Sequence, residues 1–448
     1  MVKLSVFGII FLLSVSFIFA DNPAVTINVD SAQDQRIIHP EIYGVNFGST
    51  SELNVFNSPL NRMGGNRTSG YNWLQNADVT GLDWYFQSYP GDSNVAGEIG
   101  DTFIDDTKSA NAEPMITIPM LDWIAKLGSN RSINWSFSIN KYGAQQAHDP
   151  FWPDSGNGVK LDGSDVVNDP TDAGTPNSSL FQQDWVNHLL NVWGDADNGG
   201  VKYYVLDNEH AIWHETHRDF HPVGATYDEI KNKMIDYATM IHSRDAAAQV
   251  VGPEEFGWAG YFFSGYDLQF CNDNPDPNCW SDPPDRANHD GWLYMDWILD
   301  QLHKHEQNTG EHVLDVFSLH YYPQSGEFSD DTSPAMQNLR NRSTRSLWDP
   351  NYKDESWIND FVYLIPRMHD WVNTFYPGLK VGITEYNWGA EDHMNGATAQ
   401  ADVLGIFGRE GLDLATRWVS PGSNTPVGNA FKIYRNYDGN FSTFGDLS

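Results

Sequence analysis

Short apolar runs rich in β-branched residues alternate along the chain with segments of helical periodicity. The stretch TYDEIKNKMIDYATMIHSRD (226–245) opens with Thr226 as an expected N-cap, and Glu229 follows at the spacing of a capping box. A second helix is expected over 397–411, ending at Gly411. Strands that alternate with helices in this way are typical of a parallel sheet.

Eight strand-like runs can be counted, of which the second and the eighth are weak on their own. Eight parallel strands with intervening helices predict an α/β fold, a (β/α)8 TIM-type barrel over residues 42–424. A doubly wound open sheet is the alternative. The runs are residues 42–48, 59–65, 114–120, 202–209, 249–254, 313–322, 380–387 and 414–418.

Two further segments fall outside this alternation. Residues 24–30 (AVTINVD) alternate like an antiparallel strand before the barrel, and residues 429–439 (NAFKIYRNYDG) have the pattern of another strand after it. We expect a small accessory β-domain formed by residues 21–41 and 425–448. With so few strands, its C-terminal part is expected to be incomplete.

The first 20 residues have the composition of a secretory signal peptide. Lys3 is followed by an apolar run to Phe19, and Ala20 is a small residue at a plausible cleavage point. A membrane anchor is the alternative, but the run is short for a membrane span. We therefore expect a secreted, extracellular protein.

The cysteines and the potential glycosylation sites fit an exported chain. Cys271 and Cys279 are the only cysteines, and the turn-forming residues between them predict one local disulfide. The same loop, or another acidic loop, could hold a structural calcium ion, although clusters of Asn, Asp and Pro are more often plain turns. N-glycosylation sequons begin at Asn66, Asn130, Asn134, Asn177, Asn341 and Asn440.

The formal net charge of −34 restricts the partners of the protein. A charge of this size repels nucleic acid and anionic membranes and fits a neutral substrate, although acidity can also serve solubility alone. The 17 Trp exceed what a core needs, so some are expected to line a cleft, where their faces can stack on sugar rings. We expect a monomer with a neutral partner rather than a nucleic acid or a membrane.

Ionisable side chains gather where the expected strands end. The fourth strand ends with Asn208 and Glu209, the sixth with His320 and Tyr322, and the seventh with Glu385. Catalytic residues of a TIM-type barrel stand at the C-terminal ends of its strands, and strands four and seven face each other across the mouth. Two carboxylates flanking a cleft suit glycosidic hydrolysis, in which one acts as an acid and the other attacks or activates water.

Seven stretches give the chain a family resemblance. They are IYGVNF, GGNRTSGYNW, KYGAQQ, YVLDNEHAIWHETHRDFHP, GWAGYFFSG, DVFSLHYYPQ and TEYNWGAEDHMNGATAQADVLGIFGREGLD. In these stretches the chain resembles glycoside hydrolase family 44, the endoglucanases and xyloglucanases with a (β/α)8 barrel and a small β-domain. The resemblance implies cleavage of internal β-1,4-glucosidic bonds in cellulose-like glucans or xyloglucan, without a catalytic cofactor. It also implies a retaining mechanism, with Glu209 as acid/base and Glu385 as nucleophile about 5–5.5 Å apart.

Other side chains are expected to bind the substrate or to support the two acids. Trp418, at the end of the eighth strand, is expected to form the floor of the sugar site. Arg62 is expected to reach Glu385 and keep it ionised. The side chains expected to face the cleft are Asn208, His320, Tyr322 and Trp418, with Trp73, Trp84 and Trp388 for more distant sugars.

Departures from the family pattern fall in this region. His210 stands where the family usually has Pro, Met63 where it has Trp, and Glu254 and Glu255 where it has small or apolar residues. An added carboxylate near the site can raise the pKa of a neighbouring acid. The departures leave open an alternative function, a non-catalytic secreted glycan-binding protein on the same barrel.

The histidines after Glu209 suggest a competing interpretation. His214, His217 and His221 could ligate zinc in a hydrolase, but HETHR lacks the HExxH spacing and no helix is evident there. The preferred interpretation is a loop over the cleft held by polar contacts, with His217 and Asp219 as structural supports and no metal at the catalytic site.

Overall fold

The structure is a computed structural model that describes Thr26 and residues 35–448. The expected signal peptide and nearly all of the 24–30 segment lie outside the described residues. Residues 36–448 form one compact unit. No helix in the described part of the chain is long and apolar enough to cross a membrane.

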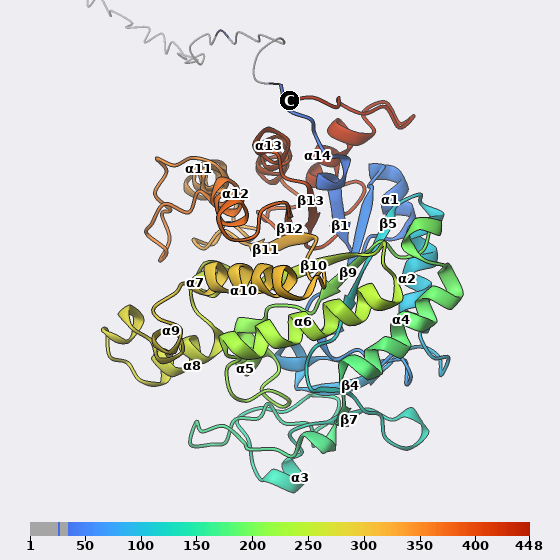
Figure 1. Ribbon diagram of the computed structural model, residues 1–448, viewed down its shortest axis with the longest axis vertical. Helices are drawn as coiled ribbons and strands as arrows, with labels where there is room; N and C mark the ends of the chain where they lie inside the picture. Colours follow the sequence, from blue (N-terminus) through green and yellow to red (C-terminus); the bar gives the residue numbers. More distant parts are fainter. Residues whose placement is uncertain (1–25, 27–34) are drawn as a thin grey trace, which may run out of the picture. The chain divides into compact units, whose positions relative to one another are not determined.

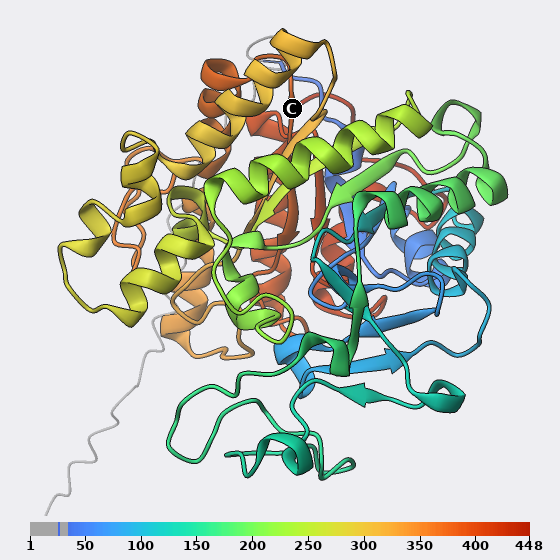
Figure 2. The same ribbon diagram turned by 60° about the horizontal axis from the view of Figure 1, so that its bottom comes forward.

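Eight parallel strands close into a barrel (Figures 1 and 2). All eight coincide with the runs expected from the sequence, so the TIM-type barrel is confirmed and the open sheet is excluded. In the order in which they pair around the barrel, the strands are β1 (Gly44–Asn46), β13 (Leu414–Arg417), β12 (Lys380–Tyr386), β11 (Val316–Tyr321), β10 (Gln249–Glu255), β9 (Tyr203–Leu206), β5 (Glu113–Ile118) and β2 (Leu60–Met63).

Helices connect these strands and cover the outside of the barrel. They include α1 (Thr50–Phe56), α2 (Glu98–Ser109), α4 (Ser179–Trp193), α6 (Tyr227–Arg244), α10 (Tyr294–Thr309), α12 (Leu364–Phe375) and α13 (Met394–Glu410). Gly411 ends α13 in the left-handed conformation, as expected. Further helices lie in the loops: α3 (Ile139–Tyr142), α5 (Trp213–Thr216), α7 (Trp258–Phe262), α8 (Gly265–Asp273), α9 (Pro284–Asn288) and α11 (Pro334–Ser343).

The expected capping box of α6 is only half formed. Thr226 is the N-cap, and its hydroxyl accepts a hydrogen bond from the backbone N–H of Glu229 at 3.2 Å. The carboxylate of Glu229 does not return to the cap. It contacts His221 Nε2 at 2.9 Å instead and so ties the preceding loop to the helix.

The core has two layers. Buried strand residues contact one another inside the barrel, and a much larger set packs between the strands and the helices. The inner cluster consists of Leu60, Met115, Tyr203, Val205, Val251, Val316 and Leu414, all fully buried. Filling of the barrel by side chains makes it a solid support rather than a pore, so chemistry is confined to the loops at its mouth.

Two small antiparallel sheets arise from insertions rather than from the termini. One contains β3 (Ala77–Val79), β4 (Gln87–Pro90) and β7 (Asn134–Trp135), and the other pairs β6 (Trp123–Ala125) with β8 (Gly174–Pro176). They belong to the long connections after β2 and β5. In Figure 1, β4, β7 and α3 lie together at the lower end of the picture, away from α13 and α14.

The prediction of a strand over 429–439 is wrong, because residues 429–435 belong to a helix, α14 (Pro426–Arg435). The Thr425 hydroxyl caps its first turn and Pro426 takes the first helical position, where its missing N–H costs nothing. The apolar residues Val427, Ala430 and Phe431 are buried at helical spacing. At the ends of the described chain, Arg36 and Ser448 exchange two backbone hydrogen bonds, of 3.0 and 2.9 Å.

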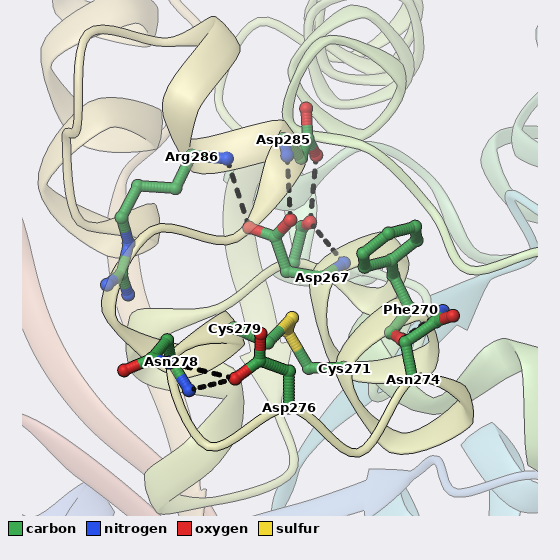
Figure 3. The surroundings of a disulfide bond; sticks show 10 residues. Asp267, Phe270, Cys271, Asn274, Asp276, Asn278, Cys279, Asp285 and Arg286 are labelled. Carbon is green, nitrogen blue, oxygen red and sulfur yellow. Dashed lines mark hydrogen bonds between the residues drawn. A yellow bond between two sulfur atoms is a disulfide. The ribbon is translucent and has the colours of Figure 1, made fainter.

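The expected disulfide joins Cys271, near the end of α8, to Cys279, with 5.6 Å between the Cα atoms (Figure 3). Between them the Asp276 carboxylate accepts hydrogen bonds from the N–H and the side-chain amide of Asn278. These bonds are those of an Asx turn. Neither of the two groups of three or more metal-ligating side chains found among the described residues includes this loop, so calcium there stays a prediction.

Candidate active site

A cleft of about 670 Å³ opens at the C-terminal ends of the barrel strands. Five of the residues singled out in the sequence line it together: Asn208, Glu209, Tyr322, Glu385 and Trp418. They follow or end four different strands, β9, β11, β12 and β13. The barrel therefore brings together residues that are up to 210 positions apart in the sequence.

Glu209 and Glu385 form a close pair in this cleft. One carboxylate oxygen of each lies within 4.8 Å of the other. His320 lies beneath both, with its Nδ1 at 2.9 Å from Glu209 Oε1 and at 3.6 Å from Glu385 Oε2. The imidazole ring is fully buried, so it supports the acids and does not itself face the cleft, in contrast to the sequence prediction.

A tight turn after β9 aims Glu209 into the cleft. Asp207 and Glu209 both have left-handed backbone conformations, which cost energy in residues other than glycine. The buried Asp207 carboxylate holds the turn by accepting hydrogen bonds from the N–H groups of Met120, Leu121 and Asn208. The N–H of Glu209 donates to the carbonyl oxygen of Glu254 at 3.0 Å.

Two donors hold the carboxylate of Glu385. Arg62, which is fully buried at the end of β2, donates from Nη1 to Oε1 at 2.8 Å, and the Tyr322 hydroxyl donates to Oε2 at 2.9 Å. The other guanidinium nitrogen of Arg62 donates to Asn208 Oδ1 at 3.0 Å and pairs with Glu254 at 2.9 Å. The structure thus places Arg62, Tyr322 and Asn208 as the sequence suggested.

Glu254 completes a buried charged network below the cleft. Burial raises its pKa, but the charges of Arg62 and His320 outweigh this and lower the pKa to about 2. For His320, burial lowers the pKa, whereas Glu385, Glu209 and Glu254 raise it to about 10. Glu254 is therefore ionised and His320 is an imidazolium at neutral pH.

Glu209 faces a different electrostatic environment from Glu385. Burial raises the pKa of Glu209, and the negative charge of Glu385 adds to the rise, while the hydrogen bond from His320 opposes it. A raised pKa favours the protonated form that a general acid needs.

Next to Glu209, Glu255 and His210 form a buried pair of groups outside the cleft. Burial, aided by the charge of Glu209, raises the pKa of Glu255 to about 8, and burial lowers that of His210 to about 4. Glu255 Oε1 and His210 Nδ1 are 3.8 Å apart, and neither has a hydrogen-bond partner. Both groups are therefore neutral at pH 7.

Of the four tryptophans proposed for sugar binding, Trp418 lines the cleft. Gly65 makes room for it: a Cβ there would come within 2.4 Å of the Trp418 ring. Trp84 is 44% exposed and lines a neighbouring hollow, which shares Asp83 with the cleft. Its indole N–H donates to Asp149 at 2.8 Å, so its ring is held in place beside the cleft.

Two of the predicted tryptophans, and Met63, lie outside the lining of the cleft. Trp388 is 2% exposed, packs against Tyr321 and donates to Ser343, so its assignment to sugar binding is wrong. Trp73 stacks on Trp185 at 5.9 Å beneath the loops and does not line the cleft, so its assignment is wrong as well. Met63 is buried and also lies outside the cleft lining.

Several residues of the cleft wall were not predicted from the sequence. Asn66 donates to the Asp83 carboxylate at 3.3 Å, and both line the cleft, together with the aromatic rings of Phe256 and Phe328. Asn66 had one signal, its place directly after the strand-two glycines. Asp83 and the two phenylalanines lie in loops, and no pattern in the sequence marks them.

The histidine segment is a structural element and not a zinc site. His214, His217 and His221 do not form a group of metal-ligating side chains in the part of the chain that the structure describes. Burial lowers the pKa of His217 to about 3, and neither of its ring nitrogens has a hydrogen-bond partner. The Asp219 carboxylate accepts a hydrogen bond from Ser136 at 2.6 Å and so supports the segment as expected. The expected polar contact of His217 is wrong, because burial without a partner holds that ring. The short helix α5 within the segment was not expected.

The cleft itself is poorly suited to a metal ion. Glu209, His320 and Glu385 lie close enough to ligate one. However, Arg62 is 2.8 Å from Glu385, and His320 carries a proton at neutral pH. These two cations already compensate the carboxylates, and both would repel a dication.

Comparison with known proteins decides the family. The model of glycoside hydrolase family 44 matches residues 77–325, more than half of the chain. The chain belongs to glycoside hydrolase family 44. The resemblance found in the sequence is thereby confirmed.

Individual similar proteins extend this result. CelM2, a bifunctional glucanase-xylanase from a metagenome library, is 57% identical, with a TM-score of 0.91 over 93% of this chain and 80% of that one. A Paenibacillus polymyxa xyloglucanase solved with xyloglucan is 30% identical, with a TM-score of 0.71 over 93% and 79% of the two chains. Endoglucanase A of Paenibacillus lautus is 31% identical over 444 residues, which cover 94% of this chain and 59% of that relative.

Proposed function

We propose that this family 44 protein is a secreted, retaining endo-glycosidase that cleaves internal β-1,4-glucosidic bonds of cellulose-like glucans or xyloglucan. The observation that carries the proposal is the Glu209–Glu385 pair, whose nearest oxygens lie within 4.8 Å. Retaining enzymes keep their two carboxyl groups about 5–5.5 Å apart, whereas inverting enzymes need about 6.5–9.5 Å to admit a water. The short separation therefore supports double displacement.

The different surroundings of the two acids support their roles. Glu385 is the nucleophile, because Arg62 and Tyr322 donate to its two oxygens and hold the carboxylate in a fixed orientation. Glu209 is the acid in the first step and the base in the second, because burial raises its pKa. Asn208 beside it presents its amide to the cleft, where it can bind a sugar hydroxyl near the scissile bond.

The substrate class follows from the cleft and from the relatives. Trp418 offers an apolar face for one sugar ring, and Asn66 and Asp83 offer polar groups along the wall. The relatives act on glucan, xylan or xyloglucan according to their names. Export is supported by the disulfide and by the composition of residues 1–20, and a monomer with no catalytic cofactor is proposed.

Glu209→Gln and Glu385→Gln variants test the assignment of roles. Glu385→Gln should lose turnover on every substrate. Glu209→Gln should fail on polysaccharide but still form the glycosyl-enzyme from an aryl glycoside whose leaving group needs no proton, and added azide should then release a product with retained configuration. Glu355→Gln is the matched control, since Glu355 is an exposed carboxylate that pairs with Arg342 outside the cleft, and the variant should keep its turnover.

Two results would contradict the proposal. An azide product of inverted configuration from Glu209→Gln would reject double displacement. Absence of reducing sugar from every β-linked polysaccharide, with tight glycan binding retained, would instead identify a non-catalytic glycan-binding protein.

A further inference from the structure

Away from the cleft, two histidines and an aspartate converge at the N-terminal end of the barrel strands. His242 lies in the last turn of α6, His312 follows α10, and Asp315 directly precedes β11. One ligand atom of each lies within 4.8 Å of the other two. We propose that these three side chains bind one divalent transition-metal ion of the zinc class.

The donor set and its dimensions fit such an ion. Two imidazoles and one carboxylate form a common set of protein ligands for zinc, with water in the remaining position. Neighbouring ligand atoms around a tetrahedral ion with bonds of about 2.0–2.1 Å are about 3.3 Å apart. His312 Nε2 is 3.1 Å from Asp315 Oδ1, and His242 Nε2 is 3.6 Å from Asp315 Oδ2. The ligand atoms of the three residues lie within 4.8 Å of one another, so the two imidazoles must draw together to bind one ion.

Outer contacts orient two of the ligands. Glu306 Oε1 is 3.0 Å from His312 Nδ1, and a proton donated there leaves the lone pair of Nε2 free for a metal. The Tyr376 hydroxyl donates to the other oxygen of Glu306. Asp315 Oδ2 accepts a hydrogen bond from the N–H of Val250 at 2.8 Å, which fixes the carboxylate against the barrel.

His242 distinguishes this arrangement from an ordinary ion pair. A protonated His312 between Glu306 and Asp315 explains the contacts of those three residues. It does not explain His242, whose Nε2 is buried, has no hydrogen-bond partner and points toward the same carboxylate. A metal ion would give this nitrogen a partner.

Charge and access favour the same conclusion. Asp315 and Glu306 supply two negative charges. Without a metal they raise the pKa of His312 to about 9, so a dication must displace one proton from this imidazole when it binds. The His312 side chain is 43% exposed, so an ion can enter from solvent. In the cleft Glu385 pairs with Arg62, whereas the ion pairs of Asp315 and Glu306 in the described part of the chain are with histidines. The proposal is independent of the proposed function, because the cluster lies at the opposite end of the barrel strands from the cleft.

Cobalt is a suitable probe, because its visible absorption reports on its coordination. The chelator-treated full chain should bind about one Co²⁺ with an absorption band of low coordination number, and Zn²⁺ should displace it. His242→Gln and His312→Gln should each weaken binding at least about tenfold, and Glu306→Gln should weaken it less. The control is His305→Gln. His305 lies in α10, outside the cluster, and pairs with the carboxylate of Glu311. It should bind as the wild type does.

Thermal unfolding provides a second readout that does not depend on the spectrum. Zn²⁺ should raise the unfolding temperature of the wild type and of His305→Gln, but not of His242→Gln or His312→Gln. Co²⁺ binding that survives both variants unchanged would overturn the proposal, and so would the absence of any saturable binding to the wild type.

Discussion

Two buried regions rich in ionisable residues differ in charge, although the second begins directly after Glu209 at the edge of the first. Below the cleft, Arg62, Glu254 and His320 are all charged, because each faces a partner of opposite charge. In the adjoining segment 210–221, burial lowers the pKa values of His210, His214 and His217 to about 4, 4 and 3. Burial alone neutralises a histidine, and a facing carboxylate reverses the effect.

The adjacent glutamates at the end of β10 differ in charge in the same way. Glu254 and Glu255 are both fully buried and point to opposite sides of one strand. Glu254 contacts Arg62 and is an anion with a pKa of about 2. Glu255 faces His210 and is a neutral acid with a pKa of about 8. The charge of a buried group is therefore set by its neighbours across the barrel, and four kinds of variant can test this.

Removal of Arg62 should have the largest effect. Arg62→Met leaves Glu254 and Glu385 buried without their cation, which should cost about 3–5 kcal/mol of stability and about 10³-fold in kcat/KM. Urea unfolding and a reducing-sugar assay measure the two losses. Arg67→Met is the control, because Arg67 is 52% exposed and pairs with Asp78 alone, so its loss should cost under about 1 kcal/mol. Equal losses in the two variants would refute the buried network.

The two glutamates should respond to pH in opposite ways. The lowered pKa of Glu254 contributes stability that is present above about pH 4.5 and is lost as the pH falls through about 2. Glu254→Gln should therefore lose roughly 3 kcal/mol at pH 7 and progressively less below pH 4.5.

Glu255 costs stability instead, because its pKa is raised. The cost is absent below about pH 4.5 and grows as the pH rises to about 8. Glu255→Gln should therefore match the wild type near pH 4.5 and exceed its stability by up to about 4 kcal/mol at pH 8. Urea unfolding across this pH range checks both variants, and parallel curves for the two would contradict the contrast.

Loss of one donor to Glu385 should have a smaller effect. Tyr322→Phe removes one hydrogen bond to a charged group, worth about 1.5–3 kcal/mol, and should lower kcat about 10- to 100-fold. The adjacent Tyr321 is buried and contacts Asp354 away from the cleft. Tyr321→Phe should therefore change stability and leave kcat within about twofold. Similar kcat values for both variants would argue against the role of Tyr322.

The smallest effect is expected in the neutral segment. His217→Leu removes a buried ring with two unpartnered nitrogens and should change stability by under about 1 kcal/mol at pH 7. Because the folded pKa of His217 is about 3, the wild type loses stability as the pH falls from about 6.5 toward 3. The variant should therefore be more stable than the wild type by about 2 kcal/mol at pH 5. His39→Leu, at a half-exposed histidine, should show no such gain.

Much of this fold could be predicted because local patterns determine it. Apolar runs placed all eight barrel strands, and the strand-end rule placed Glu209 and Glu385 in one cleft. The terminal strand failed because a short amphipathic run suits a strand or a helix equally, although Thr425 and Pro426 are a helix start signal.

Other features depend on contacts that the sequence does not record. Trp388 and Trp418 both follow strand ends, but one ring turns outward to Ser343 and the other into the cleft. The ionisation of Glu254 required knowledge that β2, β10 and β11 converge beneath the mouth. The cluster of His242, His312 and Asp315 joins the end of α6 to the connection between α10 and β11, and His242 is 70 positions from His312, so no spacing in the chain reveals it.

The cleft lining divides the protein into a fixed part and an exchangeable part. Strand ends supply the two acids, while Asp83, Phe256 and Phe328 come from loops after β2, β10 and β11. Because the barrel interior holds the acids without help from these loops, laboratory evolution can shorten, graft or randomise the loops and leave the chemistry in place. Substrate preference can then be altered by recombining loops among family 44 proteins on this scaffold.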